Sequence, residues 1–484
     1  LDSKWYHLYC SVQRCNSALR VLNAATDEQV NGRVSRIAEM KVLRAHYYFE
    51  LSRLFNKIPY FDENVEISQY PDIPNNEFTR DEILSMLAKE MLDAAEQLPA
   101  SQPEVGRIHK YIALAYAAKI KLYQAYQQDE ITHAVTSINK ELLREVVSLC
   151  DQVTASNRYG LLDDFQGLDL VTNENGKESV FAIQYSMNDG TESAGRINWS
   201  NLLNSPGGGS PYGGDGFFLP SQDLINAYQT DANGLPDFNY QSKSDYSWAV
   251  LNNGVYTLQN TTPNVDPRLD FVVGRPTITW KTYPDKPCEG WVRDKDTYGY
   301  NCAKRFWVSP ESSDMFNGWP WGASQLNWQI IRYADILLWK AEALIELNEG
   351  NGLETARDLI NQIRNRARNS AYVKDFNDHS KYAANYLVNP YPADVWNQDY
   401  ARQALRWETR LEKALEGERF FDLVRWGIVE TTMNKYITAE SDNRIYYANA
   451  HFTGGKDEYY PVPNNQYGFS GGKYVQNPGY APFN

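Results

Sequence analysis

The chain has 484 residues, of which 42% are hydrophobic and 22% are charged, values that are ordinary for a globular protein. A chain of this length buries a large core without disulfide bonds. The formal net charge of −14 argues against nucleic acid or an anionic membrane surface as the main partner. The outlying feature is the aromatic content, 13 Trp, 34 Tyr and 18 Phe, because tyrosine and tryptophan offer apolar faces with polar edges to amphipathic ligands.

The first third of the chain has helical periodicity. Segment 39–55, EMKVLRAHYYFELSRLF, repeats apolar residues at spacings of three and four and stops before Pro59, which cannot continue a helix. Another helix is predicted to begin after the capping candidate Thr79. The alanine-rich segment 109–126 and segment 141–153 predict two further helices, which we expect to pack as an antiparallel pair.

The middle of the chain, about 160–325, has a different character, with Gly, Pro and Asn turns, short apolar runs and most of the Trp residues. The glycine-rich loop 205–218 resembles a phosphate-binding loop only in its glycines, because it lacks the Gly-Lys-Ser/Thr ending. Nucleotide binding is therefore not predicted. Segment 218–230, FLPSQDLINAYQT, predicts a short helix.

Helical periodicity returns in two segments, 327–348 and 352–367, whose small residues at facing positions favour close packing. Each half of the chain thus contains helix pairs that look like degenerate tetratricopeptide hairpins. Such hairpins bury their apolar faces only by stacking on one another. The sequence therefore predicts a mainly α scaffold of stacked hairpins with a loop-rich, aromatic middle.

Segment 411–427, LEKALEGERFFDLVRWG, is either a site with paired carboxylates or a structural brace. In the helix predicted over 400–427, Glu416 and Glu418 are two positions apart and point in divergent directions, whereas the carboxylates of a glycosidase converge on one bond. We therefore interpret the segment as a brace in which Gly417 permits close approach of a neighbour. The expected ion pairs join Arg410, Arg419 and Arg425 to Glu412, Glu416, Glu418 and Asp422.

Eight motifs in the same order resemble the SusD/RagB family of outer-membrane nutrient-binding lipoproteins of Bacteroidetes-type bacteria. No single motif is decisive, but together they span nearly the whole chain. They are MKVLRAHYYFELSRLFNKIPYF (40–61), LPSQDLINAYQT (219–230), DPRLDFVVGRP (266–276), IIRYADILLWKAEALIEL (330–347), ARDLINQIRNRA (356–367), RLEKALEGERFFDLVRWG (410–427), YYPVPNNQ (459–466) and QNPGY (476–480).

The resemblance implies one SusD-like domain, an α superhelix with four tetratricopeptide-like hairpins on one side and a loop-rich ligand face on the other. It also implies non-catalytic binding of glycans, or less often peptides, as a lid on a SusC-like TonB-dependent transporter. No catalytic residue, cofactor or metal ligand is predicted. The expected parts are an N-terminal helical half (1–158), a loop-rich insertion (159–325), C-terminal helical hairpins (326–430) and an irregular C-terminal segment (431–484).

Members of this family sit on the extracellular face of the outer membrane through an N-terminal lipid. The chain begins at Leu1 without Met or a signal peptide, so we expect that the anchor lies in sequence preceding it. Cys10 does not fit the lipid-bearing role, because LYCSV lies within a helical pattern and lacks the small residues of a lipobox. No run approaches the ~18 apolar residues of a membrane span.

A surface site for sugars needs aromatic rings for stacking and polar side chains at the hydroxyls. The resemblance points to the loop face and identifies no individual ligand residue, so candidates come from aromatic residues in loops. The alternative for each is that it anchors its loop in a local core, as we expect for the helical Tyr47, Tyr48, Phe49, Trp339 and Trp426. The predicted ligand contacts are Tyr283, Trp291, Trp319 and Trp321, followed by Trp280, Tyr70, Arg368 and Tyr391.

Other functions stay open at this point. An α-helical glycoside hydrolase would share this composition, but no carboxylate pair stands out among the 61 acidic residues. A peptide-binding lid would need an extended groove, and a pure repeat scaffold leaves the aromatic loops at 280–325 unexplained. Cys288 and Cys302 lie in one loop-rich segment and are a candidate disulfide, whereas Cys10, Cys15 and Cys150 lie in helical patterns and are expected in the core.

Overall fold

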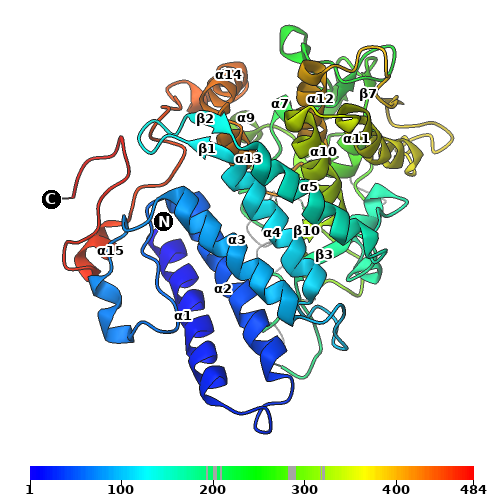
Figure 1. Ribbon diagram of the computed structural model, residues 1–484. Helices are drawn as coiled ribbons and strands as arrows, with labels where there is room; N and C mark the ends of the chain where they lie inside the picture. The colour runs from blue at the N-terminus through cyan, green and yellow to red at the C-terminus, as the bar shows by residue number, and fades with distance from the viewer. Residues whose placement is uncertain are drawn as a thin grey trace.

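The computed structural model describes residues 1–191, 195–199, 204–205, 207, 210–281, 290–316, 318 and 322–483, and it is mainly α-helical, as predicted (Figure 1). The first block of helices comprises α1 (Asp2–Ala24), α2 (Arg33–Phe55), α3 (Arg80–Gln97), α4 (Lys110–Ala125) and α5 (Lys140–Ala155). The second comprises α10 (Tyr333–Leu347), α11 (Gly352–Asn369), α12 (Gln398–Glu412), α13 (Arg419–Arg425) and α14 (Val429–Ser441).

The helices pack in chain order as a succession of hairpins. Helix α1 contacts α2, α2 contacts α3, α3 contacts α4 and α4 contacts α5. Helix α5 also packs on α10, which in turn contacts α11 and α12, so the two blocks join in one scaffold (Figure 1). The C-terminal segment returns to the start of the chain, where Asn465 and Gln466 donate hydrogen bonds to the carboxylate of Asp2.

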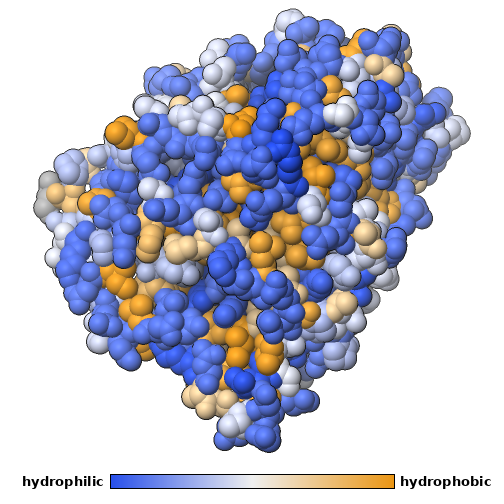
Figure 2. Space-filling view, viewed as in Figure 1, coloured by the Kyte–Doolittle hydropathy of each residue, from blue (hydrophilic) through white to orange (hydrophobic). Residues whose placement is uncertain are grey.

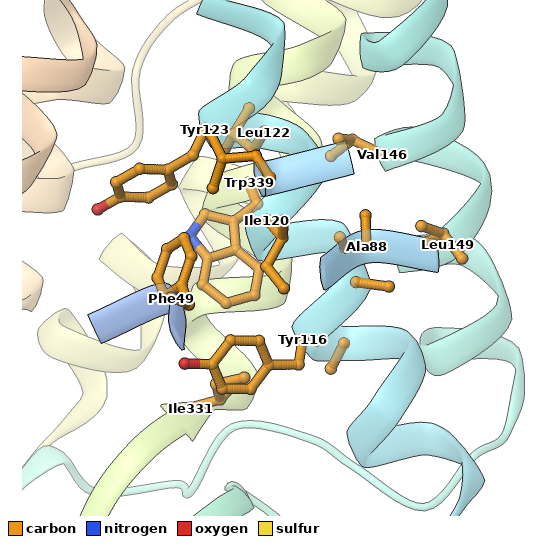
Figure 3. Packing of buried hydrophobic residues seen from close by; sticks show 14 of the residues in the cluster. Phe49, Ala88, Tyr116, Ile120, Leu122, Tyr123, Val146, Leu149, Ile331 and Trp339 are labelled. Carbon is orange, nitrogen blue, oxygen red and sulfur yellow. The ribbon is translucent and has the colours of Figure 1, made fainter. Parts of the chain in front are cut away.

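One hydrophobic core connects both blocks (Figure 3). In it, Phe49 of α2 makes edge contacts with Tyr116 and Tyr123 of α4, at ring-centroid distances of 5.8 and 5.0 Å, and Trp339 of α10 lies in the same cluster. Hydrophilic residues cover most of the outer face shown in Figure 2. The expected core aromatics are confirmed: Tyr48, Phe49, Trp339 and Trp426 are buried, and Tyr47 packs partly buried against them.

The predicted start of α3 is confirmed in detail. The Thr79 hydroxyl accepts a hydrogen bond from the Glu82 backbone N–H, and the Glu82 carboxylate accepts one from the Thr79 backbone N–H. This reciprocal arrangement satisfies donors that a helix start otherwise leaves unpaired. Helix α3 then buries Ile83, Leu84, Leu87 and Met91 against its neighbours.

The helix predicted over 327–348 is wrong at its beginning. Residues Trp328–Arg332 form strand β10, which pairs antiparallel with β3 (Ser179–Ile183), and α10 begins only at Tyr333. The run Trp-Gln-Ile-Ile favours a strand once a partner is present, because aromatic and β-branched side chains fit a pleated surface. That partner lies some 150 residues earlier, which local periodicity does not reveal.

The single helix predicted over 400–427 is also wrong, because α12 and α13 are separated by Lys413–Glu418. Leu415 and Gly417 have left-handed backbone angles there, with φ of +66° and +81°. A Cβ atom at Gly417 would meet no atom within 4 Å, so close approach of a neighbour is not the reason for this glycine. It serves the left-handed backbone, which glycine adopts without strain.

Short elements link the loops of the middle and C-terminal parts. The paired strands are β1 (Tyr126–Gln128) with β2 (Val135–Ile138), β5 (Ala249–Asn252) with β6 (Val255–Leu258), β8 (Val273–Gly274) with β9 (Cys302–Ala303), and β7 (Asn264–Val265) between β4 (Gln229–Thr230) and β11 (Asn385–Tyr386). The short helices are α7 (Gln222–Ala227), α8 (Arg268–Val272), α9 (Lys295–Tyr298) and α15 (Asn464–Phe469). The 3₁₀ turns are η1 (Ile67–Asp72), η2 (Phe165–Asp169), η3 (Val171–Asn173), η4 (Tyr240–Ser242) and η5 (Ile445–Tyr447).

Cys15 and Cys150 are buried in helices, as expected, and Cys10 is half-buried. Cys288 lies outside the described residues, so its pairing with Cys302 stays a prediction. Among the helices that the structure describes, none is long and apolar enough to cross a membrane. The described acidic, histidine and cysteine side chains do not gather into a group that could hold a metal ion.

Candidate functional site

A cleft of about 850 Å³ opens in the loop-rich middle of the chain. Its walls come from segments 162–177, 279–281, 304–314 and 371–379, together with Phe271. A volume of this size accommodates a small oligosaccharide or a ligand of similar bulk. We therefore take this cleft as the candidate site.

Tyrosine rings gather on one side of the cleft. The ring of Tyr372, which lines it, lies 5.3 Å from that of Tyr382 and 5.1 Å from that of Tyr386. Tyr382 is 54% exposed, and the Lys374 ammonium, also in the cleft wall, lies 4.0 Å from the centre of its ring. The exposed ring of Tyr382 therefore flanks the cleft, packed on the lining residues Tyr372 and Lys374, a combination that binds amphipathic ligands.

Polar groups tie two walls of the cleft together. The Asp164 carboxylate accepts hydrogen bonds from the backbone N–H groups of Gln166, at 2.9 Å, and Ala371, at 3.1 Å. The Gln166 side-chain amide donates to the Ala371 carbonyl at 2.9 Å. Close by, Asp163 and Lys177 form an ion pair of 2.9 Å in which the carboxylate is almost wholly exposed. Carboxylate, amide and ammonium groups are therefore available to ligand hydroxyls.

The floor of the cleft contains a buried carboxylate, that of Asp169. It pairs with Lys281 at 2.9 Å and Arg305 at 3.1 Å and accepts the Phe306 backbone N–H at 3.1 Å. Burial by itself raises the pKa of Asp169, but Lys281 and Arg305 outweigh it and hold that pKa below its ordinary value. An ionised carboxylate committed to two cations does not donate a proton to a leaving group.

The cleft floor continues into the segment interpreted as a brace. Arg305 also pairs with Glu416 at 3.2 Å, and Glu416 pairs with Arg332 at 3.0 Å and Lys413 at 2.5 Å. All of these side chains are at least 93% buried. The brace interpretation is confirmed, and its ion pairs run directly to the residues beneath the candidate site.

Most of the partners predicted for this brace are wrong. Only the pair of Arg425 with Asp422, at 3.0 Å, forms as expected. Arg410 pairs with Asp223 at 2.6 Å, and Glu418 pairs with Arg53 of α2 and Lys119 of α4. Glu412 pairs with Arg268, Arg332 and Arg366. Apart from the pairs of Arg425 with Asp422 and of Lys413 with Glu416, the charged residues of this segment pair with residues of distant elements.

The buried ion pairs predict loss of stability in acid. Burial alone raises the pKa of Glu412, but Arg366, Arg332 and Arg268 overcome it and lower that pKa to about 2 from 4.5. Because the folded pKa lies below the unfolded one, the stabilisation is fully present above the unfolded pKa and is lost as the pH falls through the folded pKa. We expect the urea midpoint to drop steeply between about pH 5 and 2. A midpoint independent of pH in that window contradicts the argument, and Glu412→Gln should flatten the drop.

Three of the predicted ligand residues, Trp280, Trp291 and Tyr391, are buried rather than exposed. The two tryptophans are 1% exposed and pack edge to face with a ring-centroid distance of 5.4 Å. Tyr391 is 2% exposed, and the Arg364 guanidinium lies 4.4 Å from its ring centre. The expectation of open rings at these positions is corrected, because protein atoms already cover them.

The other five predicted ligand residues are Tyr283, Trp319, Trp321, Tyr70 and Arg368. Tyr283, Trp319 and Trp321 lie outside the described residues, so their roles stay predictions. Tyr70 stacks on Phe61 with a ring-centroid distance of 3.9 Å and is half-buried. Arg368 is exposed near the end of α11, and its backbone carbonyl accepts a hydrogen bond from the hydroxyl of the cleft residue Tyr372 at 2.9 Å.

Sequence reasoning missed Trp307, Lys374 and Tyr382. Trp307 lines the cleft and packs on Tyr212 at a ring-centroid distance of 4.5 Å, in the same cluster as Trp280 and Trp291. The buried tryptophans thus support the cleft wall from behind. The tyrosine-rich run that follows Arg368 was the one available signal, and it does mark a wall of the cleft.

The comparisons with known proteins agree with this fold. The chain belongs to the SusD family, whose model matches residues 177–480, and a second model, described as starch-binding associating with outer membrane, matches residues 2–122. A SusD-like protein of Bacteroides ovatus is 22% identical over 447 residues, and the match spans 88% of this chain and 65% of that relative.

Solved structures show the same helical, tetratricopeptide-like architecture. A SusD homolog from Bacteroides thetaiotaomicron superposes with a TM-score of 0.69 at 18% identity, covering 99% of this chain and 86% of that one. Surface glycan-binding protein A from the same organism, in complex with laminarihexaose, gives a TM-score of 0.65 at 18% identity, covering 98% and 85%. These likenesses establish the fold.

Proposed function

We propose that this protein binds oligosaccharides in the cleft without cleaving them and delivers them to a SusC-like TonB-dependent transporter. We further infer that it works on the extracellular face of the outer membrane, held by an N-terminal lipid. The observation that carries the proposal is a cleft of about 850 Å³, lined by Tyr372 and flanked by the exposed Tyr382, in a SusD-family fold. A structural relative in complex with laminarihexaose supports a glycan as the ligand class.

The chemistry of the cleft favours capture over cleavage. A glycosidase needs one carboxyl group that stays protonated to donate to the leaving oxygen, together with a second carboxylate. In the cleft floor, Lys281 and Arg305 keep Asp169 ionised and occupied. Stacking on a few rings, with hydrogen bonds at the edges, gives an affinity on the order of μM to mM, because few contacts must offset the cost of association. Weak, reversible binding suits delivery to a transporter.

The test is a calorimetric titration with laminarihexaose and a panel of plant, microbial and host oligosaccharides, combined with an assay for new reducing ends. We expect binding heat with at least one glycan and no new reducing ends. Tyr372→Ala and Tyr382→Ala should each weaken that binding about tenfold or more, because they remove rings at the cleft. New reducing ends contradict capture without cleavage.

A matched control separates the cleft from general surface effects. Tyr6 on α1 is 58% exposed, close to the 54% of Tyr382, but no residue of α1 lines the cleft, whereas Tyr382 packs on the lining residue Tyr372. Tyr6→Ala should leave glycan affinity unchanged. Equal losses in Tyr6→Ala and Tyr382→Ala contradict the assignment of the site to the cleft.

A further inference from the structure

A second aromatic surface lies on residues that take no part in the cleft. Tyr298, at the end of α9, is 47% exposed, and Tyr446, in η5, is 49% exposed. Their ring centroids are 6.0 Å apart with an interplanar angle of 41°, and Ile445 beside them is 79% exposed. We call these three residues the tyrosine platform.

The platform rests on a second layer of tyrosines. The ring of Tyr446 lies 4.6 Å from that of Tyr447, which lies 5.5 Å from the ring of Tyr436 on α14. The hydroxyl oxygens of Tyr436 and Tyr447 are 3.1 Å apart, within hydrogen-bond distance. Because the lower rings are held in this way, the upper rings have a firm support, which lowers the entropic cost of binding a ligand to them.

A close backbone contact joins the two segments of the platform. Gly299, directly after Tyr298, has φ of +77°, and a Cβ atom there would lie 1.9 Å from Nη2 of Arg444. The Arg444 side chain therefore passes close to the backbone at Gly299. Glycine leaves room for it because it has no Cβ atom, and it adopts this left-handed conformation without strain. The glycine lets two segments nearly 150 residues apart approach closely, and their exposed tyrosines lie side by side.

The chemistry of the platform fits a sugar. The tyrosine faces are apolar and suit the C–H face of a pyranose ring, whereas their hydroxyls and the exposed carboxylates of Asp296 and Asp442 suit its hydroxyl groups. Three exposed apolar residues cover far less than the roughly 1,000 Å² that a stable protein interface needs. We propose that the tyrosine platform is a second glycan-binding site, which stacks on a distant part of a polysaccharide chain bound in the cleft. This inference rests on the proposed function.

Two sites on one chain predict a dependence on ligand length. A short oligosaccharide occupies the cleft alone, whereas a polymer that reaches the platform gains a second, intramolecular contact. Loss of the platform should therefore weaken polymer binding and leave binding of the short ligand unchanged. Loss of the cleft rim should weaken both.

The experiment compares four forms of the full chain: the natural protein, the double variant Tyr298→Ala/Tyr446→Ala, the cleft variant Tyr382→Ala and the control Tyr6→Ala. Affinity electrophoresis is run in gels that contain laminarin, starch, xylan or mannan, and calorimetry uses the hexasaccharide of each retarding polymer. We expect the double variant to bind the polymer at least about tenfold more weakly with unchanged hexasaccharide affinity. Far-UV circular dichroism checks that each variant is folded.

The outcomes separate the two proposals. Unchanged polymer retardation in the double variant overturns the platform as a glycan site while the cleft stands. Equal loss of polymer and hexasaccharide binding in the double variant overturns it as a separate site. Loss of polymer binding in the double variant, with polymer and hexasaccharide binding unchanged in Tyr382→Ala, supports the platform and contradicts the assignment of the first site to the cleft. Retardation by none of the polymers contradicts both.

Discussion

Replacement of Arg332 by alanine is expected to lower the free energy of unfolding by about 3–5 kcal/mol, the usual cost of removing one partner from a buried ion pair. The Arg332 guanidinium pairs with Glu412 at 2.7 Å, Glu178 at 2.9 Å and Glu416 at 3.0 Å, and it is 1% exposed. Its removal leaves Glu412, Glu178 and Glu416 buried with one cationic partner fewer each. Urea denaturation at neutral pH, followed by circular dichroism, measures the change.

The control is an arginine that also pairs with more than one carboxylate, but at the surface. Arg144 pairs with Glu141 and Glu349, and all three side chains are exposed. Arg144→Ala should leave the midpoint nearly unchanged, because solvent screens exposed ion pairs. If Arg332→Ala shifts the midpoint no more than Arg144→Ala does, the buried network does not stabilise the fold.

The sequence predicts those parts of this fold that depend on neighbours in the chain. The apolar faces of α2, α3 and α4 and the N-terminal cap at Thr79 depend on residues within one or two helical turns. Periodicity and capping rules therefore predict these helices from the sequence. Strand β10 was missed because its pairing with β3 depends on a segment far away in the chain. The partners of Glu418 were missed for the same reason, since Arg53 and Lys119 arrive from the first helix block.

The candidate site was predictable in location but not in its side chains. Loop composition pointed to the aromatic middle, and the predicted contact Arg368 lies just before segment 371–379; both regions contribute walls of the cleft. A tryptophan in a loop has the same local sequence whether it faces solvent or a small core. Trp280 and Trp291 are covered because Tyr212 and Trp307 pack on the same cluster, and only tertiary structure brings these four rings together.

Replacement of Trp280 by alanine tests whether this tryptophan is a buried support of the cleft rather than a ligand contact. The ring is 1% exposed, donates its indole N–H to the Ala303 carbonyl at 3.2 Å, and packs 5.3 Å from the ring of Tyr212. Truncating a buried tryptophan costs about 3–5 kcal/mol, because it removes apolar contacts and leaves a cavity. We expect a loss of this order in urea denaturation, together with weaker glycan binding, since the next residue, Lys281, holds Asp169 in the cleft floor.

The comparison with Tyr382→Ala distinguishes a supporting ring from a ligand-contacting one. Tyr382 is 54% exposed, so its removal should weaken glycan binding while the unfolding midpoint stays close to that of the natural protein. Trp280→Ala should lower both quantities, and Trp280→Phe, which restores most of the buried area, should recover part of each. If Trp280→Ala instead abolished glycan binding without lowering the unfolding midpoint, the indole would be a ligand contact. The residues that cover it would then have to move when the glycan binds.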